Sequence, residues 1–486
     1  MFAPHHSHAA DPAKSLEADY VIVGAGAAGM AFADSLLGDS AHSMIIVDRR
    51  HQPGGHWVDS YPFIRLHGPS AHYGVNSRPL GEDAVEHGGW NDGLMQLASG
   101  AEICAYFDRV MQDHLLPSGR VTYLPMTELG QGGVARSLVD GRLVQLRARR
   151  KWVDATVADT QVPATHPPRF SVADGVRWTT PNDLVRQALP APRHVIVGGG
   201  KTGIDVALWL LGQGVDPDSI TWIRPREAWL LNRALVQPSG RGLLATVSAN
   251  AQEMEAAAAA ESVTGLFARL ERAELLRRID REVTPTMFRC AIVSDAELAQ
   301  LRRIRHVVRG AHVLAIEPRR IVLTRGTVAT TPDALHVHCS AAGLPRPRHE
   351  PVFQRGRIVL QYVRRCSPCF SAALIARLEA TLDDDEARNA LCEPVAPPEV
   401  PLDWLRMHLR SARNQQRWSK SPALRAWFAR SRLDPMAGAI ERALAGPEAP
   451  ALLDALERYR RALPAGPADR RSEERRVGKE CRSRWS

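Results

Sequence analysis

The chain has 486 residues, a formal net charge of +9, 44% hydrophobic and 24% charged residues, an ordinary composition for a globular protein. This length is sufficient for two or three domains with buried cores. No apolar run reaches membrane-spanning length without glycine or charge, and the basic residues form no dense patch with aromatic residues. We therefore expect neither a membrane protein nor a nucleic-acid-binding protein.

Both ends of the chain are expected to lie outside the folded domains. Residues 1–17 contain three histidines but no apolar core of a signal peptide, which indicates a disordered leader in a cytoplasmic protein. Residues 471–486 resemble the read-through translation of a sequencing adapter. This tail has six basic and three acidic residues, so without it the charge falls from +9 to +6. The seven cysteines form no evenly spaced disulfide framework, which agrees with a reducing compartment, and we expect no metal site.

The first nucleotide-binding signal follows residues 20–23, a short apolar run that predicts a buried parallel strand. Gly24 allows a tight turn, Gly26 lets the backbone approach a pyrophosphate, and Gly29 lets the next helix pack closely on the strand. A helix expected over residues 27–37 directs its positive end at that pyrophosphate.

The next apolar run ends in Asp48, where an acidic side chain can accept hydrogen bonds from ribose hydroxyls. A short loop then leads to Gly-Gly-His-Trp at residues 54–57. This order of strand, acid, loop and Gly-Gly-x-Trp resembles the first dinucleotide-binding domain of the flavin-containing monooxygenase-like flavoproteins, which carry FAD there. The resemblance implies that FAD contacts Gly24, Gly26, Ala27, Ala28, Gly29, Asp48, Arg49, Gly55, His56 and Trp57.

Residues 61–76 are rich in aromatic residues and proline and resemble the loop that runs beside the flavin ring in that family. Arg65, His67 and Asn76 are then flavin-side candidates, and no other catalytic residue is suggested. The alternative is a loop that only packs under the sheet. The sequence leaves both interpretations open.

An amphipathic helix is expected over residues 101–115, followed by a hairpin whose turn is marked by Asp140-Gly141. We therefore expect residues 18–189 to form the first part of an FAD-binding domain with an inserted antiparallel sheet.

A second unit repeats this pattern from His194, with Gly198, Gly200 and Gly203 at the turn and helix start and Lys201 and Thr202 beside them. Two such units in one chain are much stronger evidence for a dinucleotide-binding protein than a single unit. Lys201 could place a positive charge against the pyrophosphate. The contacts expected for this second nucleotide are Gly198, Gly200, Lys201, Thr202, Gly203, Arg224 and Arg226.

The acidic residue of the first unit is replaced in the second by Arg224, with Arg226 two residues later. An arginine fork suits the 2′-phosphate of NADPH, which a carboxylate would repel. The alternative is a pair of solvated surface arginines.

We expect the remaining chain to follow the order of the two-domain flavoproteins. The NADPH-binding domain covers residues 190–343, with a helical insertion at 249–310 that forms either a lid or an oligomer contact. Residues 344–400 return to the FAD-binding domain, and residues 401–470 form a helical C-terminal region. Within 344–400, a helix expected over residues 370–380 would direct its N-terminus at the flavin, with Ser367 and Pro368 suited to start it.

The expected fold class is α/β, with two Rossmann-like dinucleotide-binding domains, a helical insertion and a helical C-terminal region. The resemblance implies an NADPH-oxidising flavoprotein that uses O2 to oxygenate a small molecule through a C4a-hydroperoxyflavin, with an oligomeric state left open. The family's histidine-containing motif before the second glycine turn is absent, so flavin reduction is better supported than oxygenation. Alternatives are a dithiol reductase using Cys366 and Cys369, and a non-catalytic regulatory flavoprotein.

Overall fold

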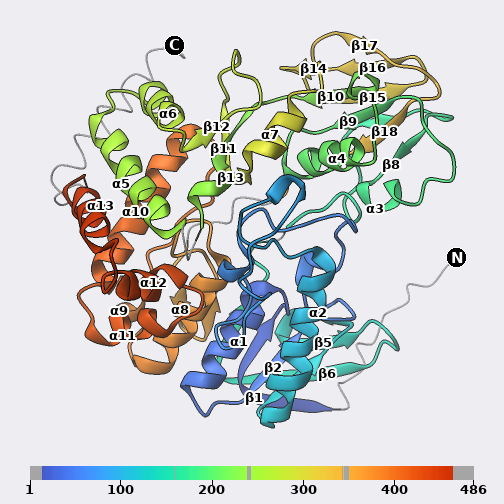
Figure 1. The fold of residues 1–486 in the computed structure, drawn as a ribbon. Coiled ribbons are helices and arrows are strands. Elements are labelled where there is room, and N and C mark those ends of the chain that lie inside the picture. Colours follow the sequence, from blue (N-terminus) through green and yellow to red (C-terminus); the bar gives the residue numbers. More distant parts are fainter. Residues whose placement is uncertain (1–13, 159, 238–241, 342, 344–349, 463–486) are drawn as a thin grey trace, which may run out of the picture.

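The computed structural model describes residues 14–158, 160–237, 242–341, 343 and 350–462. Two lobes are built on β-sheets and a third is mainly helical (Figure 1). The tail at residues 471–486 and most of the expected leader lie outside the described residues. Residues 15–17, expected in the leader, instead begin the first strand.

The first lobe is built on a sheet with strand order β19-β20-β6-β1-β2-β3, in which β20, β6, β1, β2 and β3 run parallel. Residues 20–22 are fully buried, as the apolar run predicts. The lobe comprises β1 (Ser15–Val23), α1 (Ala27–Asp39), β2 (Met44–Val47), α2 (Gly100–Val110), β3 (Val121–Leu124), β4 (Thr127–Leu129), β5 (Val134–Ser137), β6 (Leu143–Asp154), β19 (Phe353–Gln354), β20 (Arg357–Val359) and α8 (Pro368–Thr381).

The expected local elements of this lobe are present. Helix α2 starts in a capping box between Ser99 and Glu102, and a π-helical turn at Met111–Leu115 extends it. The hairpin is formed by β5 and β6, which pair antiparallel.

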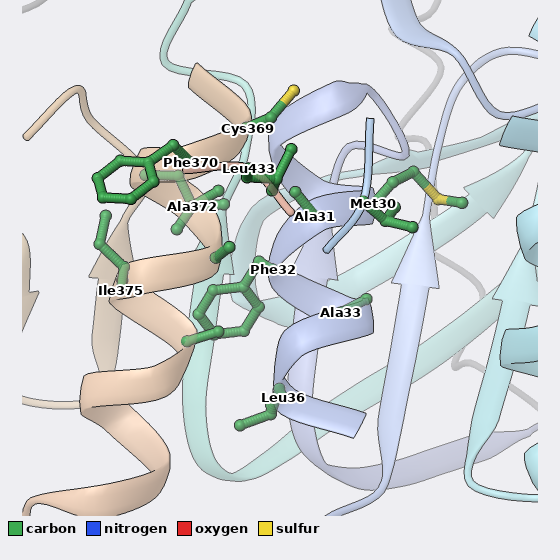
Figure 2. Packing of buried hydrophobic residues seen from close by; sticks show 14 of the residues in the cluster. Met30, Ala31, Phe32, Ala33, Leu36, Cys369, Phe370, Ala372, Ile375 and Leu433 are labelled. Carbon is green, nitrogen blue, oxygen red and sulfur yellow. The ribbon is translucent and has the colours of Figure 1, made fainter. Parts of the chain in front are cut away.

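Helices α1 and α8 pack against each other beside this sheet. Figure 2 shows Phe32 of α1 facing α8, which contributes Phe370, Ala372 and Ile375 to the same buried cluster. Small residues on both helices, glycine and alanine on α1 and alanine on α8, permit this close packing. The N-terminal ends of both helices are thereby fixed relative to the sheet.

The second lobe is built on a parallel sheet with strand order β14-β10-β9-β18-β8, and a smaller sheet, β17-β16-β15-β7, lies beside it. It comprises β7 (Ser171–Val172), β8 (Trp178–Thr179), α3 (Pro181–Leu184), β9 (His194–Val197), α4 (Lys201–Gly212), β10 (Ile220–Arg224), α7 (Asp295–Leu301), β14 (His306–Arg309), β15 (Val313–Glu317), β16 (Arg320–Leu323), β17 (Thr327–Ala329) and β18 (Leu335–His338). Two parallel sheets with crossover helices confirm the expected fold class.

The boundary expected at residue 189 is too late. Strands β7 and β8 already pair with β15 and β18 of the second lobe, so the chain has entered that lobe by residue 171. The two strands are only two residues long, which is too short for a recognisable alternation of polar and apolar residues.

The third lobe surrounds a small sheet of order β12-β11-β13. The stretch at residues 249–310 is not only helical, because it also supplies β12, β13 and β14. The lobe comprises β11 (Ala228–Asn232), α5 (Leu243–Ala259), α6 (Val263–Arg272), β12 (Leu276–Arg277), β13 (Met287–Val293), α10 (Pro401–Trp418), α11 (Pro422–Arg430), α12 (Pro435–Ala443) and α13 (Ala449–Ala462). Helix α9 (Asp385–Ala390) packs instead against β19 of the first lobe, where Asn389 hydrogen-bonds Phe353. Among the described residues, no helix combines the length and apolar composition needed to cross a bilayer.

Candidate nucleotide-binding site

The first glycine loop has the geometry that its sequence requires. Gly24 has a φ of +104°, and its amide donates to the carbonyl of Val47, 2.8 Å away. A Cβ on Gly29 would lie 2.0 Å from the carbonyl oxygen of Gly24, so only glycine allows α1 to approach β1 this closely.

The second glycine loop repeats this geometry. Gly198 has a φ of +132°, and its amide donates to the carbonyl of Ile223 at 3.0 Å. A Cβ on Gly203 would lie 2.1 Å from the oxygen of Gly198. No atom lies within 4 Å of the Cβ position of Gly200, so the face of the middle glycine is open.

The helices that follow these loops begin without a side-chain cap. Gly26 is the N-cap of α1 and Gly200 is the N-cap of α4, and neither helix receives a capping hydrogen bond from a side chain. By contrast, α2 and α7 start in complete capping boxes. The free amides of α1 and α4 are suited to an anion such as a pyrophosphate.

Asp48 lies directly after β2 and is 5% exposed. Its Oδ2 accepts a hydrogen bond from the amide of Ala25 at 2.6 Å, and its Oδ1 accepts one from the amide of Arg50 at 2.8 Å. The carboxylate therefore holds the glycine loop in shape. Each oxygen keeps a further lone pair that could accept a ribose hydroxyl.

The Gly-Gly-His-Trp segment packs directly on the glycine loop. The amide of Gly54 donates to the carbonyl of Ala25 at 2.9 Å, and a Cβ on Gly55 would lie 2.9 Å from the Cα of Gly26. Trp57 is buried and donates through Nε1 to the hydroxyl of Tyr73 at 2.7 Å. Its neighbour on the chain, His56, has its pKa lowered to about 4 by burial and by the charge of Arg50. Of the predicted contacts, Arg49 is exposed just beyond Asp48.

Arg224 lies directly after Ile223, but its guanidinium group is neither exposed nor unpaired. It is buried, lies over the ring of Trp222 at 4.6 Å, and pairs with Glu227 at 3.2 Å. Burial lowers the pKa of its guanidinium to about 10. Its Nε and Nη1 have no hydrogen-bond partner among the described residues, so two buried donors remain available.

Arg226 is exposed and forms an ion pair with Glu399, 3.3 Å away. The two predicted arginines therefore differ in environment. Each of them faces a glutamate in this structure.

Lys201, the first residue of α4, is held by Asp205 one turn later, 2.5 Å away. Asp205 also accepts a hydrogen bond from the hydroxyl of Tyr61 in the first lobe, at 2.6 Å. Desolvation raises the pKa of Asp205 and of Tyr61. Thr202 is half-buried beside Lys201. The motif predicted Lys201 but not its partners, because Tyr61 lies 144 residues from Asp205 in sequence.

The three flavin-side candidates each have protein partners. Arg65 is exposed, forms an ion pair with Glu86 and donates to the carbonyl of Leu97. His67 accepts a hydrogen bond at Nδ1 from the amide of Ile292, 3.0 Å away. Burial and the charges of Lys201 and Arg233 lower the pKa of His67 to about 3, so it is neutral near pH 7.

Asn76 accepts a hydrogen bond from the hydroxyl of Ser431, 2.8 Å away, which fixes the loop to the end of α11. Arg432 donates to the carbonyls of Ala71, Tyr73 and Val75 in the same loop. The loop at residues 61–76 is thus an interface with the other two lobes. The sequence gives no sign of these contacts.

A cavity of about 40 Å³ lies where the N-terminal ends of α1 and α8 meet the carboxyl ends of β6 and β20. Its lining includes Ala28 of α1, Ala155 after β6, Gln361 after β20, and Pro368 and Ala372 of α8. Ligands of parallel α/β sheets bind at the carboxyl ends of the strands. The cavity is well below the ~300 Å³ of ordinary ligand pockets, so a dinucleotide requires its walls to move.

Helix α8 begins at Pro368 as expected, but Ser367 does not cap it. The hydroxyl of Ser367 donates to the carbonyl of Arg365 at 2.9 Å, and no side chain caps the helix. Its first amides thus remain available at the cavity.

The alternative of a redox-active dithiol formed by Cys366 and Cys369 is wrong. Cys366 forms a disulfide with Cys290 of β13, and Cys369 is a buried free thiol whose pKa burial raises to about 12. The disulfide also contradicts the argument that the cysteines indicate a reducing compartment, and a cytoplasmic location stays a prediction. Nowhere in the described parts of the chain do three or more potential metal ligands gather.

Comparison with known proteins agrees with the first unit and identifies relatives of most of the chain. The NAD(P)-binding Rossmann-like domain family matches residues 22–77. Rv2000 of Mycobacterium tuberculosis and Mb2023 of Mycobacterium bovis are each 48% identical over 426 residues, 88% of this chain and 79% of theirs. The chain belongs to the Rv2000 family. Both mycobacterial members carry the name uncharacterized protein, so membership brings no reaction with it.

Solved structures with a similar chain trace include several flavoproteins. A flavin-containing monooxygenase from Stenotrophomonas maltophilia is 17% identical, with 77% of this chain and 99% of that chain covered and a TM-score of 0.42. A cyclohexanone monooxygenase is 13% identical, with 78% and 88% covered and a TM-score of 0.46. The bacillithiol disulfide reductase Bdr of Staphylococcus aureus is 11% identical, with 76% and 99% covered and a TM-score of 0.41. At these values the similarity carries no argument about the reaction.

Proposed function

We propose that this member of the Rv2000 family is an FAD-dependent, NADPH-oxidising oxidoreductase that oxygenates a small molecule. The observation that carries the proposal is the duplicated nucleotide unit. In both copies the amide of the first glycine donates to a carbonyl near the end of the next strand, that of Val47 or Ile223, and the third glycine packs against the carbonyl oxygen of the first. One chain thus offers two dinucleotide cradles of the same design.

The first cradle fits FAD. Asp48 stands where a ribose is recognised, and the free amides of α1 stand where a pyrophosphate is recognised. The uncapped start of α8 borders the same cavity and supplies a positive helix end for a flavin. FAD would supply the hydride acceptor and the reactivity with O2, while the chain binds and orients it.

The second cradle fits NADPH. Arg224 replaces the acid at the position equivalent to Asp48 and keeps two donors without partners, and the face of Gly200 is open. An anionic nucleotide could also draw the ammonium of Lys201 away from Asp205, since the two are neighbours at the start of α4. The substrate and the oxygenation step rest on the family resemblance of the first cradle. Neither dithiol reduction by Cys366 with Cys369 nor a separate catalytic residue is part of the proposal.

The FAD content of the Gly26→Ala variant tests the first assignment. Gly26 has a φ of −77°, and its Cβ would lie 3.4 Å from the nearest atom, so the fold accepts alanine. The methyl group would nevertheless stand where the pyrophosphate must approach. We expect a strongly reduced flavin content after purification and a thermal stability equal to that of wild-type protein from which FAD has been removed. Gly38→Ala is the matched control, because its Cβ would meet no atom within 4 Å at the far end of α1.

Full FAD content in Gly26→Ala would show that the nucleotide lies elsewhere. FAD bound in the wild type without NADPH oxidation would instead favour the non-catalytic regulatory flavoprotein.

A further inference from the structure

The Cys290–Cys366 disulfide joins two segments that are 76 residues apart in the sequence. Cys290 lies in β13 of the third lobe, and Cys366 lies in the turn between β20 and α8 of the first lobe. The bond therefore connects the two lobes directly. Two residues after Cys366, Pro368 begins α8 and lines the cavity.

The two halves of the disulfide differ in accessibility. Cys366 is exposed, whereas Cys290 is only 8% exposed and lies in the cluster around Met407. The sulfur of Met407 lies 3.7 Å from that of Cys366 and 3.9 Å from that of Cys290, so the inner side of the bond is covered. A dissolved thiol can thus approach only from the Cys366 side.

The other described cysteines are unsuited to the same chemistry. Cys339, Cys369 and Cys392 are buried free thiols, and burial raises the pKa of each. Cys104 is half-buried and its pKa is also raised by burial. Thiolates, not thiols, are the nucleophiles in disulfide exchange, so these cysteines react slowly.

Both half-cystines have a backbone conformation that is rare for residues with a side chain. Cys290 has a φ of +55° and Cys366 a φ of +44°. Such conformations persist where the surrounding structure enforces them. The disulfide is a constraint that Cys290 and Cys366 share. Opening the bond would let each segment relax.

We propose that Cys366 is a thiol-exchange site for low-molecular-weight thiols such as glutathione, with Cys290 as its resolving partner. A thiolate attacks the sulfur of Cys366, the bond to Cys290 breaks, and the electron pair leaves on the sulfur of Cys290, which takes up a proton. The product is a mixed disulfide on Cys366. In the reverse direction, the thiolate of Cys290 attacks that mixed disulfide, restores the Cys290–Cys366 bond and releases the small thiol.

A second small thiolate can also attack the mixed disulfide at its outer sulfur. The two small thiols then leave joined as one small-molecule disulfide, and Cys366 is freed as a thiol. Overall, two small thiols are oxidised and one protein disulfide is reduced. The small-molecule disulfide is the oxidant for the return reaction. The exchange requires neither nucleotide.

Thiol counting and adduct mapping on the full chain test this proposal. Denatured without reductant, air-oxidised protein should show free thiols at Cys104, Cys339, Cys369 and Cys392, and none at Cys290 and Cys366, which form the disulfide. Native Cys290→Ser protein treated with glutathione disulfide should carry one adduct at Cys366, while Cys366→Ser should carry none at Cys290. Cys104→Ser is the matched control, and its Cys290–Cys366 bond should exchange as in the wild type.

The wild type provides a measurement that does not depend on variant folding. Equilibration with glutathione at stepped ratios of thiol to disulfide should move the Cys290 and Cys366 peptides together from cross-linked to reduced, with the mixed disulfide on the Cys366 peptide only. Free thiols at both Cys290 and Cys366 after oxidation would overturn the proposal. So would an adduct on Cys290, or a Cys366 in the Cys290→Ser variant that glutathione disulfide leaves unmodified.

Discussion

Asp48 and Arg224 occupy equivalent positions in two copies of one structural unit. Each follows the strand residue, Val47 or Ile223, whose carbonyl accepts the amide of the first glycine. An acid stands at this position in one copy and an arginine in the other. We therefore expect the two copies to favour nucleotides that differ at the ribose.

The second cradle is tested by Gly200→Ala. Alanine is compatible with the φ of −84° and meets no atom within 4 Å, so apparent thermal stability and FAD content should stay at wild-type values. The methyl group would lie on the open face that the pyrophosphate needs. We therefore expect the KM for NADPH to rise about tenfold or more, which is the effect of losing one charge-assisted hydrogen bond. Steady-state kinetics measure it. An unchanged KM would remove Gly200 from the site.

Cofactor preference is tested by Arg224→Gln. Loss of a hydrogen bond to a charged group costs about 1.5–3 kcal/mol, so NADPH binding should weaken roughly ten- to a hundredfold. NADH has no 2′-phosphate and should be affected much less. Stopped-flow flavin reduction with both cofactors compares them, with Arg319→Gln, an exposed arginine of the β15–β16 turn, as the control. Equal losses for NADPH and NADH would contradict this role of Arg224.

The lowered pKa of His67 predicts a dependence of stability on pH. Its pKa is lowered from 6.5 to about 3, so below pH 6.5 the unfolded chain binds a proton that the folded chain does not. Its contribution to stability is therefore complete above pH 6.5 and declines as the pH falls toward 3, by up to about 1.4 kcal/mol per pH unit.

His67→Asn keeps an acceptor for the amide of Ile292 but cannot be protonated in this range. Its free energy of unfolding in urea should fall less steeply between pH 6.5 and 4 than that of the wild type. His51→Asn, at an exposed histidine, should match the wild-type slope. Parallel curves for all three proteins would show that His67 is protonated in the folded state.

Removal of the disulfide should destabilise the protein. For a cross-link spanning 76 residues, loss of the constraint on the unfolded chain costs up to about 4.5 kcal/mol. Cys290→Ser with Cys366→Ser should therefore lower the urea midpoint, and reductant should lower it similarly in the wild type but not in the double variant. Cys104→Ser should retain the response to reductant. A wild type whose midpoint is the same with and without reductant would show that no such bond forms.

The sequence was sufficient for the parts of the fold that depend on local chemistry. The glycine turns at Gly24 and Gly198 could be predicted because tight turns and close helix packing admit only glycine. The strand before each turn could be predicted from its continuous apolar run.

Contacts between distant residues could not be predicted. Tyr61 forms a hydrogen bond with Asp205, 144 residues away in the sequence, and Cys290 forms a disulfide with Cys366, 76 residues away. No periodic pattern in the sequence marks either pair. The neighbouring C-x-x-C pattern instead suggested a local dithiol. The burial of Arg224 against Glu227 was equally invisible, because a basic residue after a strand is exposed in most proteins.

The most direct test of the account is anaerobic titration of the FAD-loaded protein with NADPH, followed by flavin absorbance. The two cradles predict that FAD stays bound through purification and that one equivalent of NADPH per FAD bleaches the oxidised flavin band. Gly26→Ala should lack the flavin, and Gly200→Ala should keep the flavin but require more NADPH. A wild-type protein that retains no FAD, or whose bound FAD stays oxidised with excess NADPH, would contradict the account.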